Sequence, residues 1–185
     1  DKTAETARPS FGRRVFGFFN GLCKVYLTVV RGTPVVVQVM IFFYVIFATA
    51  KDGTMVAALA FGINSGAYVA EIIRGGIMSI DNGQFEAGRS LGFNYLQTMR
   101  YIIVPQTIKN VLPSLMNEFI ALLKETSVAG YVAVQDLTKA GDIIRSRTLA
   151  PFMPLLAVAL VYLIMVVVLS AGVSRLERRL RNGTR

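Results

Sequence analysis

The sequence of 185 residues contains no histidine and a single cysteine, Cys23. Without histidine, the chain lacks the side chain that most often serves as a general base near neutral pH. A single thiol makes neither a disulfide framework nor a multi-thiolate zinc site. These absences argue against a chain that catalyses a reaction by itself, and we expect it to hold no metal.

Charged residues are also scarce, at 17% of the chain against 54% for hydrophobic residues, and the mean hydropathy is +0.53. Soluble domains normally carry about 25% charged residues, so lipid is the expected solvent. The net charge of +9 does not indicate nucleic acid, because the basic residues flank apolar runs instead of alternating with aromatics on a polar face. We therefore predict an all-α, polytopic transmembrane helix bundle.

Four segments have the length and composition of membrane spans, at about 1.5 Å per residue against a hydrocarbon core of about 30 Å. They cover residues 34–50, 55–73, 105–123 and 152–173. Pro34 suits a first helical turn, and Lys51-Asp52-Gly53 ends that span with a polar stop. Small residues in the second span let neighbouring backbones approach. Pro113 is expected to kink the third span, and the fourth has the clearest transmembrane composition.

Residues 81–104 show a different pattern, with apolar residues at helical spacing and polar residues on the other face. Two helix starts are legible, Asp81 with Gln84 and Asn94 with Gln97, each pairing an N-cap oxygen with a residue three positions later. Gly92 lies between them as a natural break. The pattern predicts two short helices joined at a bend and lying at the membrane surface.

The distribution of lysine and arginine predicts the orientation, because cytoplasmic loops carry an excess of both. Fifteen of these residues fall on one side of the predicted spans and five on the other, namely Lys51, Lys124, Lys139, Arg145 and Arg147. Both termini and residues 81–104 therefore face the cytoplasm, and residues 124–151 face outward. Residues 1–33 are expected to form a cytoplasmic or interfacial segment, and residues 174–185 a basic cytoplasmic tail that anchors to headgroups or contacts a partner.

Within the surface segment, Glu86-Ala87-Gly88 is followed by Gly92, Ile102 and Pro105. This spacing resembles the EAA signature of the permease subunits of binding-protein-dependent ABC importers, with Gly88 in place of the second alanine and Val104 in place of a leucine. The resemblance implies a bacterial inner-membrane protein whose segment 81–104 couples to an ATPase. The residues it assigns to that coupling are Glu86, Ala87, Gly88, Arg89, Gly92, Phe93 and Pro105.

The resemblance continues through Arg31-Gly32-Thr33-Pro34 with Gln38, through residues 64–74 and through residues 117–128. It is similar to the branch that carries polar amino acids, and it places a permease domain at residues 34–173. Permeases of this branch normally have one more span before the Arg-Gly-Thr-Pro segment. Because polar sequence precedes that segment here, we expect this span to be absent from the sequence.

The energy source is predicted to be a partner, since the chain contains no Gly-Lys dipeptide and therefore no P-loop for ATP phosphates. We expect no cofactor on this chain, with ATP and magnesium bound by separate ABC ATPase subunits. A bent cytoplasmic element gives such a partner a surface to grip, with Phe85, Leu91, Phe93 and Tyr95 as candidate docking residues. The resemblance further implies a second permease subunit and an extracytoplasmic amino-acid-binding protein.

Polar groups inside the spans are candidates for the substrate pathway, because ionisable residues at membrane depth are costly. The candidates are Asn64, Ser65, Glu71, Asn117, Glu118, Thr126 and Ser127. Each has a structural alternative: an ion pair with Arg74 for Glu71, helix capping for Thr126 and Ser127, and interhelical hydrogen bonds for the other four. Two other functions stay open, a proton-coupled secondary transporter and a membrane scaffold that does not transport.

Overall fold

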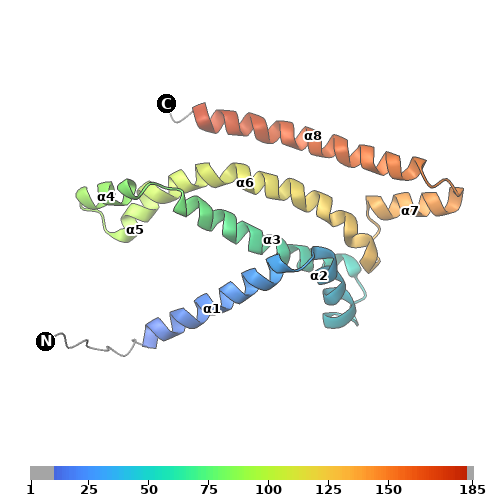
Figure 1. Ribbon diagram of the computed structural model, residues 1–185, viewed down its shortest axis with the longest axis horizontal. Coiled ribbons are helices and arrows are strands. Elements are labelled where there is room, and N and C mark those ends of the chain that lie inside the picture. The colour runs from blue at the N-terminus through green and yellow to red at the C-terminus, as the bar shows by residue number, and fades with distance from the viewer. Residues whose placement is uncertain (1–10, 183–185) are drawn as a thin grey trace.

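The computed structural model describes residues 11–182, and the predictions for residues 1–10 and 183–185 lie outside this range (Figure 1). Every regular element within it is helical. In chain order the elements are α1 (Phe11–Gly32), α2 (Val35–Ile41), the π-helix η1 (Phe42–Ile46), α3 (Gly53–Met78), α4 (Asn82–Ser90), α5 (Tyr95–Thr98), the π-helix η2 (Met99–Ile103), α6 (Val104–Glu125), the 3-10 helix η3 (Thr126–Val132), α7 (Leu137–Thr148) and α8 (Met153–Asn182).

Three long helices form the centre of the bundle, with α6 in contact with both α3 and α8 (Figure 1). Two of them are long and apolar enough to cross a membrane: Gly53–Met78, with a hydropathy of 1.5, and Met153–Arg179, with a hydropathy of 2.8. The third, α6, has 22 residues and hence a length of about 33 Å, but its composition is more polar. The all-α transmembrane bundle is confirmed.

The chain breaks sharply at Pro34, which lies in extended backbone with φ −64° and ψ 135° between α1 and α2. Arg14–Gly32 and Val35–Ile46 meet at 109° and pass as a membrane span only when taken together. A proline ring disfavours helical backbone at the preceding residue, which ends α1. The prediction of a single span over residues 34–50 is therefore wrong, because its helical part ends at Ile46.

Two further differences follow from this break. A 22-residue helix, α1, occupies most of the stretch predicted as an interfacial segment over residues 1–33. By length and composition the described residues hold two spans, or three if the bent pair is one span, where four were predicted. The apolar residues of α1 alternate with polar ones at helical spacing, so the helix is amphipathic and lacks the continuous apolar run that marked the other segments.

The third predicted span corresponds to α6, Val104–Glu125, which has Pro105 in its first turn and so agrees with the predicted start. What was not predicted is that α5 and η2 lead directly into this helix, so that the helical backbone runs from Tyr95 to Glu125. The wider π-turn of η2 just before Pro105 relaxes the i to i−4 ladder into which the proline ring would otherwise intrude. The helix also continues through Pro113.

The buried core lies where α2, α3 and η3 meet, and consists of Val39, Ala57, Ala60, Phe61, Ala129 and Val132. Small residues on α3 make this packing possible, as predicted for the second span. A Cβ added at Gly53 would lie 2.5 Å from the carbonyl oxygen of Val132, and one at Gly76 would overlap Val111 of α6. Close backbone approach therefore fixes α3 against its neighbours near both of its ends.

The two ends of the bundle carry different elements. Figure 1 places α4 and α5 at one end, together with the beginning of α1 and the end of α8. The opposite end holds α7 and the turn from α2 into α3. The predicted coupling segment and the loop predicted to face outward thus lie at opposite ends of the molecule.

Candidate functional site: a coupling segment and the polar groups of the bundle

The segment between α3 and α6 folds as two short helices joined at a bend, as predicted. Asp81 begins α4 by accepting a hydrogen bond from the Gly83 N–H at 2.6 Å. Asn94 and Gln97 form the predicted capping box, with reciprocal hydrogen bonds of 2.9 Å. Gln84 makes no such box with Asp81, because its side chain accepts from Gln106 at 3.1 Å and ties α4 to α6.

Gly92 makes the bend. Its φ of +78° lies in the left-handed region, which glycine enters without the strain that a Cβ would cause. The Gly92 N–H donates to the Arg89 carbonyl at 2.9 Å, and the Phe93 N–H donates to the Gly88 carbonyl at 3.0 Å. These two bonds form a Schellman motif that ends α4 and returns the chain toward α5.

Gly88 is the contact between the two short helices. It is buried, and an added Cβ would lie 2.6 Å from both Cγ2 and Oγ1 of Thr98 on α5. Thr98 is itself 2% exposed. Glycine therefore fits at this position of the EAA-like pattern because Thr98 already occupies the space that an alanine methyl group would need.

The outer face of the segment is open to a partner. Glu86, Ala87 and Arg89 are exposed, as is Pro105 at the start of α6. Large apolar side chains lie beside them, namely Leu91, Tyr95 and Leu96, which are 69%, 66% and 75% exposed. Leu96 was not predicted as a docking residue, because its helical spacing placed it on the apolar face of the segment.

Two of the predicted docking residues are less available. Phe85 and Phe93 are half-buried. The Phe93 ring packs on the ring of Tyr101, with 6.1 Å between centroids. The contact between Phe93 and Tyr101 packs the start of α5 against η2, and the protruding apolar surface consists of Leu91, Tyr95 and Leu96.

Inside the bundle, Asn64 lies at the centre of a polar cluster. It is 2% exposed, and its Nδ2 donates to Oε1 of Gln38 at 3.0 Å. The Gln38 Nε2 in turn lies 2.7 Å from the carbonyl oxygen of Val30, 3.1 Å from that of Thr33 and 2.7 Å from Thr33 Oγ1. One amide therefore joins the end of α1, the break, α2 and α3. The sequence pattern included Gln38 but gave no sign of this role.

Ser65, the next residue on α3, bonds in another direction, since its hydroxyl donates to Oε1 of Glu118 on α6 at 3.4 Å. The structure therefore brings Ser65 to Glu118 and Asn64 to Gln38, in two separate interhelical hydrogen bonds. Asn117 is exposed, on another side of α6. Of the two roles considered for Glu118, cavity lining and an interhelical hydrogen bond, the structure contains the hydrogen bond.

Glu71 forms the predicted ion pair with Arg74, using both carboxylate oxygens at 2.9 Å. Arg31 adds a second cation at 3.3 Å and lies over the Tyr68 ring, 5.6 Å from its centroid. An open groove of about 610 Å³ runs beside them between α1 and α3, and Lys24 also lines it. Glu71 therefore joins α1 to α3 and lies apart from the Asn64 cluster.

Thr126 and Ser127 have different positions. The Thr126 hydroxyl donates to the Leu123 carbonyl at 2.7 Å and closes the end of α6, so it caps the preceding helix and not the following one. Ser127 lines a cavity of about 440 Å³ together with residues of α7. Sequence reasoning missed this group of charged residues, because it lies on a short helix outside every apolar run.

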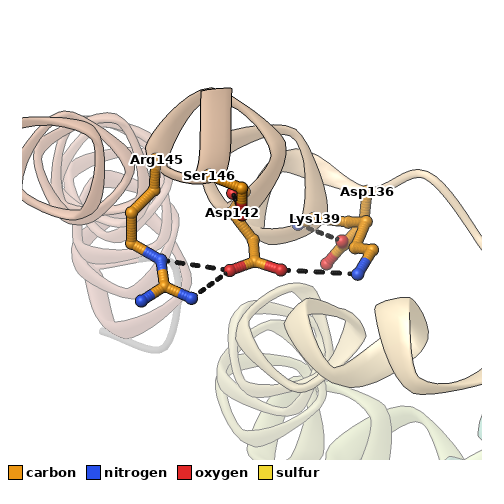
Figure 2. Close-up of polar contacts among 5 residues, drawn as sticks. All are labelled: Asp136, Lys139, Asp142, Arg145 and Ser146. Carbon is orange, nitrogen blue, oxygen red and sulfur yellow. Dashed lines mark hydrogen bonds and ion pairs between the residues drawn. The ribbon is translucent and has the colours of Figure 1, made fainter. Parts of the chain in front are cut away.

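Asp142 organises that group on α7 (Figure 2). Its Oδ1 accepts from Arg145 Nη2 at 2.6 Å and Nε at 3.1 Å, and its Oδ2 accepts from Lys139 Nζ at 3.4 Å. The hydrogen bonds from Arg145 and then from Lys139, together with their positive charge, lower the pKa of Asp142 below the ordinary aspartate value. The carboxylate therefore remains ionised at neutral pH.

The apolar helices, the polar groups between them and the capped, exposed bend define a helical membrane protein of the transport class, in which a surface element is presented to a partner. Over residues 9–182 the sequence matches the model of the family described as binding-protein-dependent transport system inner membrane component. The chain belongs to this family, and it is the permease component of an ABC importer.

Individual relatives agree with this assignment. The chain is 40% identical over 168 residues to the probable glutamine ABC transporter permease protein GlnM of Bacillus subtilis (strain 168), covering 90% of this chain and 78% of the relative. It is 39% identical over 174 residues to the glutamine transport system permease protein GlnP of Escherichia coli (strain K12), covering 91% and 80%.

Solved structures also resemble the chain. A crystal structure of an amino acid ABC transporter with histidines superposes with a TM-score of 0.80 at 44% identity, covering 84% of this chain and 74% of that one. The MetNI methionine ABC transporter in an inward-facing conformation gives a TM-score of 0.69 at 16% identity, over 90% and 76% of the two chains. This second likeness shows the fold alone. The resemblance inferred from the EAA-like pattern is confirmed.

Proposed function

We propose that this permease moves polar amino acids into a bacterial cell, driven by ATP hydrolysis on separate ABC ATPase subunits. The observation that carries the proposal is the α4–α5 bend, whose Glu86, Arg89, Leu91 and Leu96 side chains are exposed at one end of the bundle. A surface of mixed charge and large apolar groups is typical of a docking site. The names of the relatives, which refer to glutamine and to amino acids, support the substrate class.

The same proposal assigns the partners and the orientation. The end that holds α4, α5, the beginning of α1 and the end of α8 faces the cytoplasm, where ATP and magnesium are bound by the ATPase and no cofactor is bound by this chain. The excess of lysine and arginine beside this end supports the assignment. A second permease subunit completes the pathway, and an external binding protein delivers the amino acid to the opposite end.

The substrate pathway runs past Asn64, Ser65 and Glu118, three polar groups of α3 and α6. A zwitterionic amino acid needs hydrogen-bond donors and acceptors side by side, which amide, hydroxyl and carboxylate groups supply. Glu71, Asn117, Thr126 and Ser127 remain candidates for contacts along the pathway. Closure of the ATPase subunits would rock the permease subunits between inward-open and outward-open states, a motion known among transport proteins.

The test is uptake into vesicles that contain the permease, the ATPase and the binding protein. Radiolabelled glutamine, arginine and histidine are offered with and without internal ATP, and with and without an imposed proton gradient. The proposal expects uptake of at least one of them that requires ATP and the binding protein. Uptake driven by the proton gradient without ATP would replace it with a secondary transporter, and hydrolysis without uptake of any substrate would favour a scaffold.

A further inference from the structure

Two amide side chains of α6 bond to the corner at which α3 ends and α4 begins. Gln106 and Asn110 are four residues apart and therefore lie on one face of α6. The Asn110 Nδ2 donates at 3.3 Å to the hydroxyl of Ser79, the C-cap of α3. The Gln106 Nε2 donates at 3.1 Å to Oε1 of Gln84 on α4. Both sides of the corner are thus bonded to α6.

The same stretch of α6 packs closely on the end of α3. A Cβ added at Gly76 would overlap the side chain of Val111 and lie 3.4 Å from Cγ2 of Thr107. Ile80, in the corner itself, is buried. The end of α3 and this part of α6 therefore form a close-packed base, and the bond from Gln106 holds the beginning of α4 on it.

The hydrogen bond between Gln106 and Gln84 has a fixed polarity. The Gln106 Nε2 also donates to the Ile102 carbonyl at 3.0 Å, so both hydrogens of the amide have acceptors. Turning this amide over would place its oxygen against the carbonyl oxygen, and neither atom can donate. Gln106 must therefore supply the donor and Gln84 the acceptor. Both side chains are half-buried, which strengthens the bond relative to one in water.

This hydrogen bond lies one helical turn along α4 from the contact of Gly88 with Thr98. Gln84 and Gly88 are four residues apart, and the exposed Glu86 of the docking surface lies between them in the sequence. At one end of this turn α4 contacts α5 through Thr98, and at the other it bonds to α6 through Gln106. A movement of α4 can therefore reach α6 without passing through the bend.

We propose that Gln106 is a positioning residue for coupling between the ATPase and the transport pathway. By donating both to Gln84 and to the Ile102 carbonyl, it holds α4 on α6, so that the docking surface and α6 move as one body. The inference rests on the proposed function, since it gives the proposed coupling segment a second connection to the helix that carries Glu118.

The experiment makes the same substitution at the two ends of the hydrogen bond. Gln84→Glu and Gln106→Glu each replace an amide with a carboxylate of nearly the same shape and add one negative charge. The carboxylate keeps the acceptor that Gln84 provides, but at Gln106 it removes both donors. Assemblies with the ATPase are purified through the permease and placed in vesicles with the external binding protein. Uptake of radiolabelled glutamine, arginine and histidine is measured together with ATP hydrolysis.

We expect Gln106→Glu to lower the amount of amino acid taken up per ATP hydrolysed by about fivefold or more, at the lower end of typical coupling between sites. Gln84→Glu should change this ratio by less than about twofold. A loss of stability or of assembly would reduce uptake and hydrolysis together, so it would leave the ratio unchanged. Gln106→Lys restores a donor at the same position and should recover most of the ratio.

Equal ratios for Gln84→Glu and Gln106→Glu would overturn the role of Gln106 while the importer stands, as would a Gln106→Lys variant no better than Gln106→Glu. If Gln106→Glu does not assemble, Gln84→Lys removes the acceptor at the other end of the bond, and a ratio equal to that of Gln84→Glu would also contradict the role. A wild-type assembly that takes up none of the three amino acids with ATP would overturn the proposed function, and the coupling role of Gln106 with it.

Discussion

At the scale of single residues, the amide of Gln38 shows how one side chain holds a broken span together. Val30 and Thr33 lie on one side of the break and Asn64 lies on a different helix, yet all three bond to the same amide. Each buried polar group in an apolar bundle needs a partner, because neither lipid nor the core supplies one. The geometry of the break therefore depends on an amide that offers both donors and an acceptor.

Replacing Gln38 with leucine tests this dependence. The substitution keeps a side chain of similar volume but leaves the buried Asn64 amide without its hydrogen-bond partner. An unsatisfied buried polar group lowers the free energy of unfolding by about 1–3 kcal/mol. We expect a clear fall in the apparent Tm of the purified protein in nanodiscs. Gln135→Leu serves as the control, since Gln135 is exposed. Equal Tm values for the two variants would show that the Gln38 amide does not hold the break.

At the scale of elements, the coupling segment is a rigid bend rather than a loose loop. A Schellman motif ends α4, a capping box begins α5, and the Gly88–Thr98 contact presses the two together. Because α5 continues through η2 into α6, any force on the bend reaches the helix that carries Glu118. If this segment passes movements of the ATPase to the bundle, as proposed, α4 must stay fixed against α5.

The pair Gly88 and Thr98 allows a test with a built-in rescue. Gly88→Ala places a methyl group on the Thr98 side chain and should tilt α4, reducing ATP-driven uptake by roughly tenfold, a loss of coupling near 1.4 kcal/mol. Thr98→Ala removes the two atoms at 2.6 Å. We therefore expect the double variant to recover most of the uptake, and Thr98→Ala alone to retain it. A double variant as impaired as Gly88→Ala would exclude this contact as the cause.

The same elements show what could be predicted from the sequence. Local signals succeeded: the N-caps at Asp81 and Asn94 and the break at Gly92 each depend on residues within a few positions of one another. Signals that needed tertiary context failed. Pro34 marks the end of α1, but no local signal gives the angle of 109° between Arg14–Gly32 and Val35–Ile46 or the end of the second helical part at Ile46. The charged cavity on α7 brings Ser127 to residues of another helix, and no period in the sequence marks that encounter.

At the scale of the whole molecule, the described helices expose large apolar surfaces. The most apolar 18-residue window of α8 has only 6% of its residues buried, against 33% for α3. Several phenylalanines of α1 are also exposed, Phe16 to 77% and Phe18 to 71%. Lipid covers such surfaces in a membrane, and the proposed second permease subunit would be another apolar cover.

The orientation of those ends can be measured with single cysteines. In a Cys23→Ser background, Ser90→Cys reports on α4 and Thr148→Cys on α7, both at exposed positions at opposite ends of the bundle. The distribution of lysine and arginine predicts that α4 faces the cytoplasm. A membrane-impermeant maleimide added to intact cells should label Thr148→Cys and leave Ser90→Cys unlabelled until the membrane is permeabilised. The reverse labelling pattern would mean that the molecule has the opposite orientation in the membrane. The α4–α5 bend would then lie on the side without ATP and the α7 cavity on the side without the external binding protein, which would contradict the proposed importer.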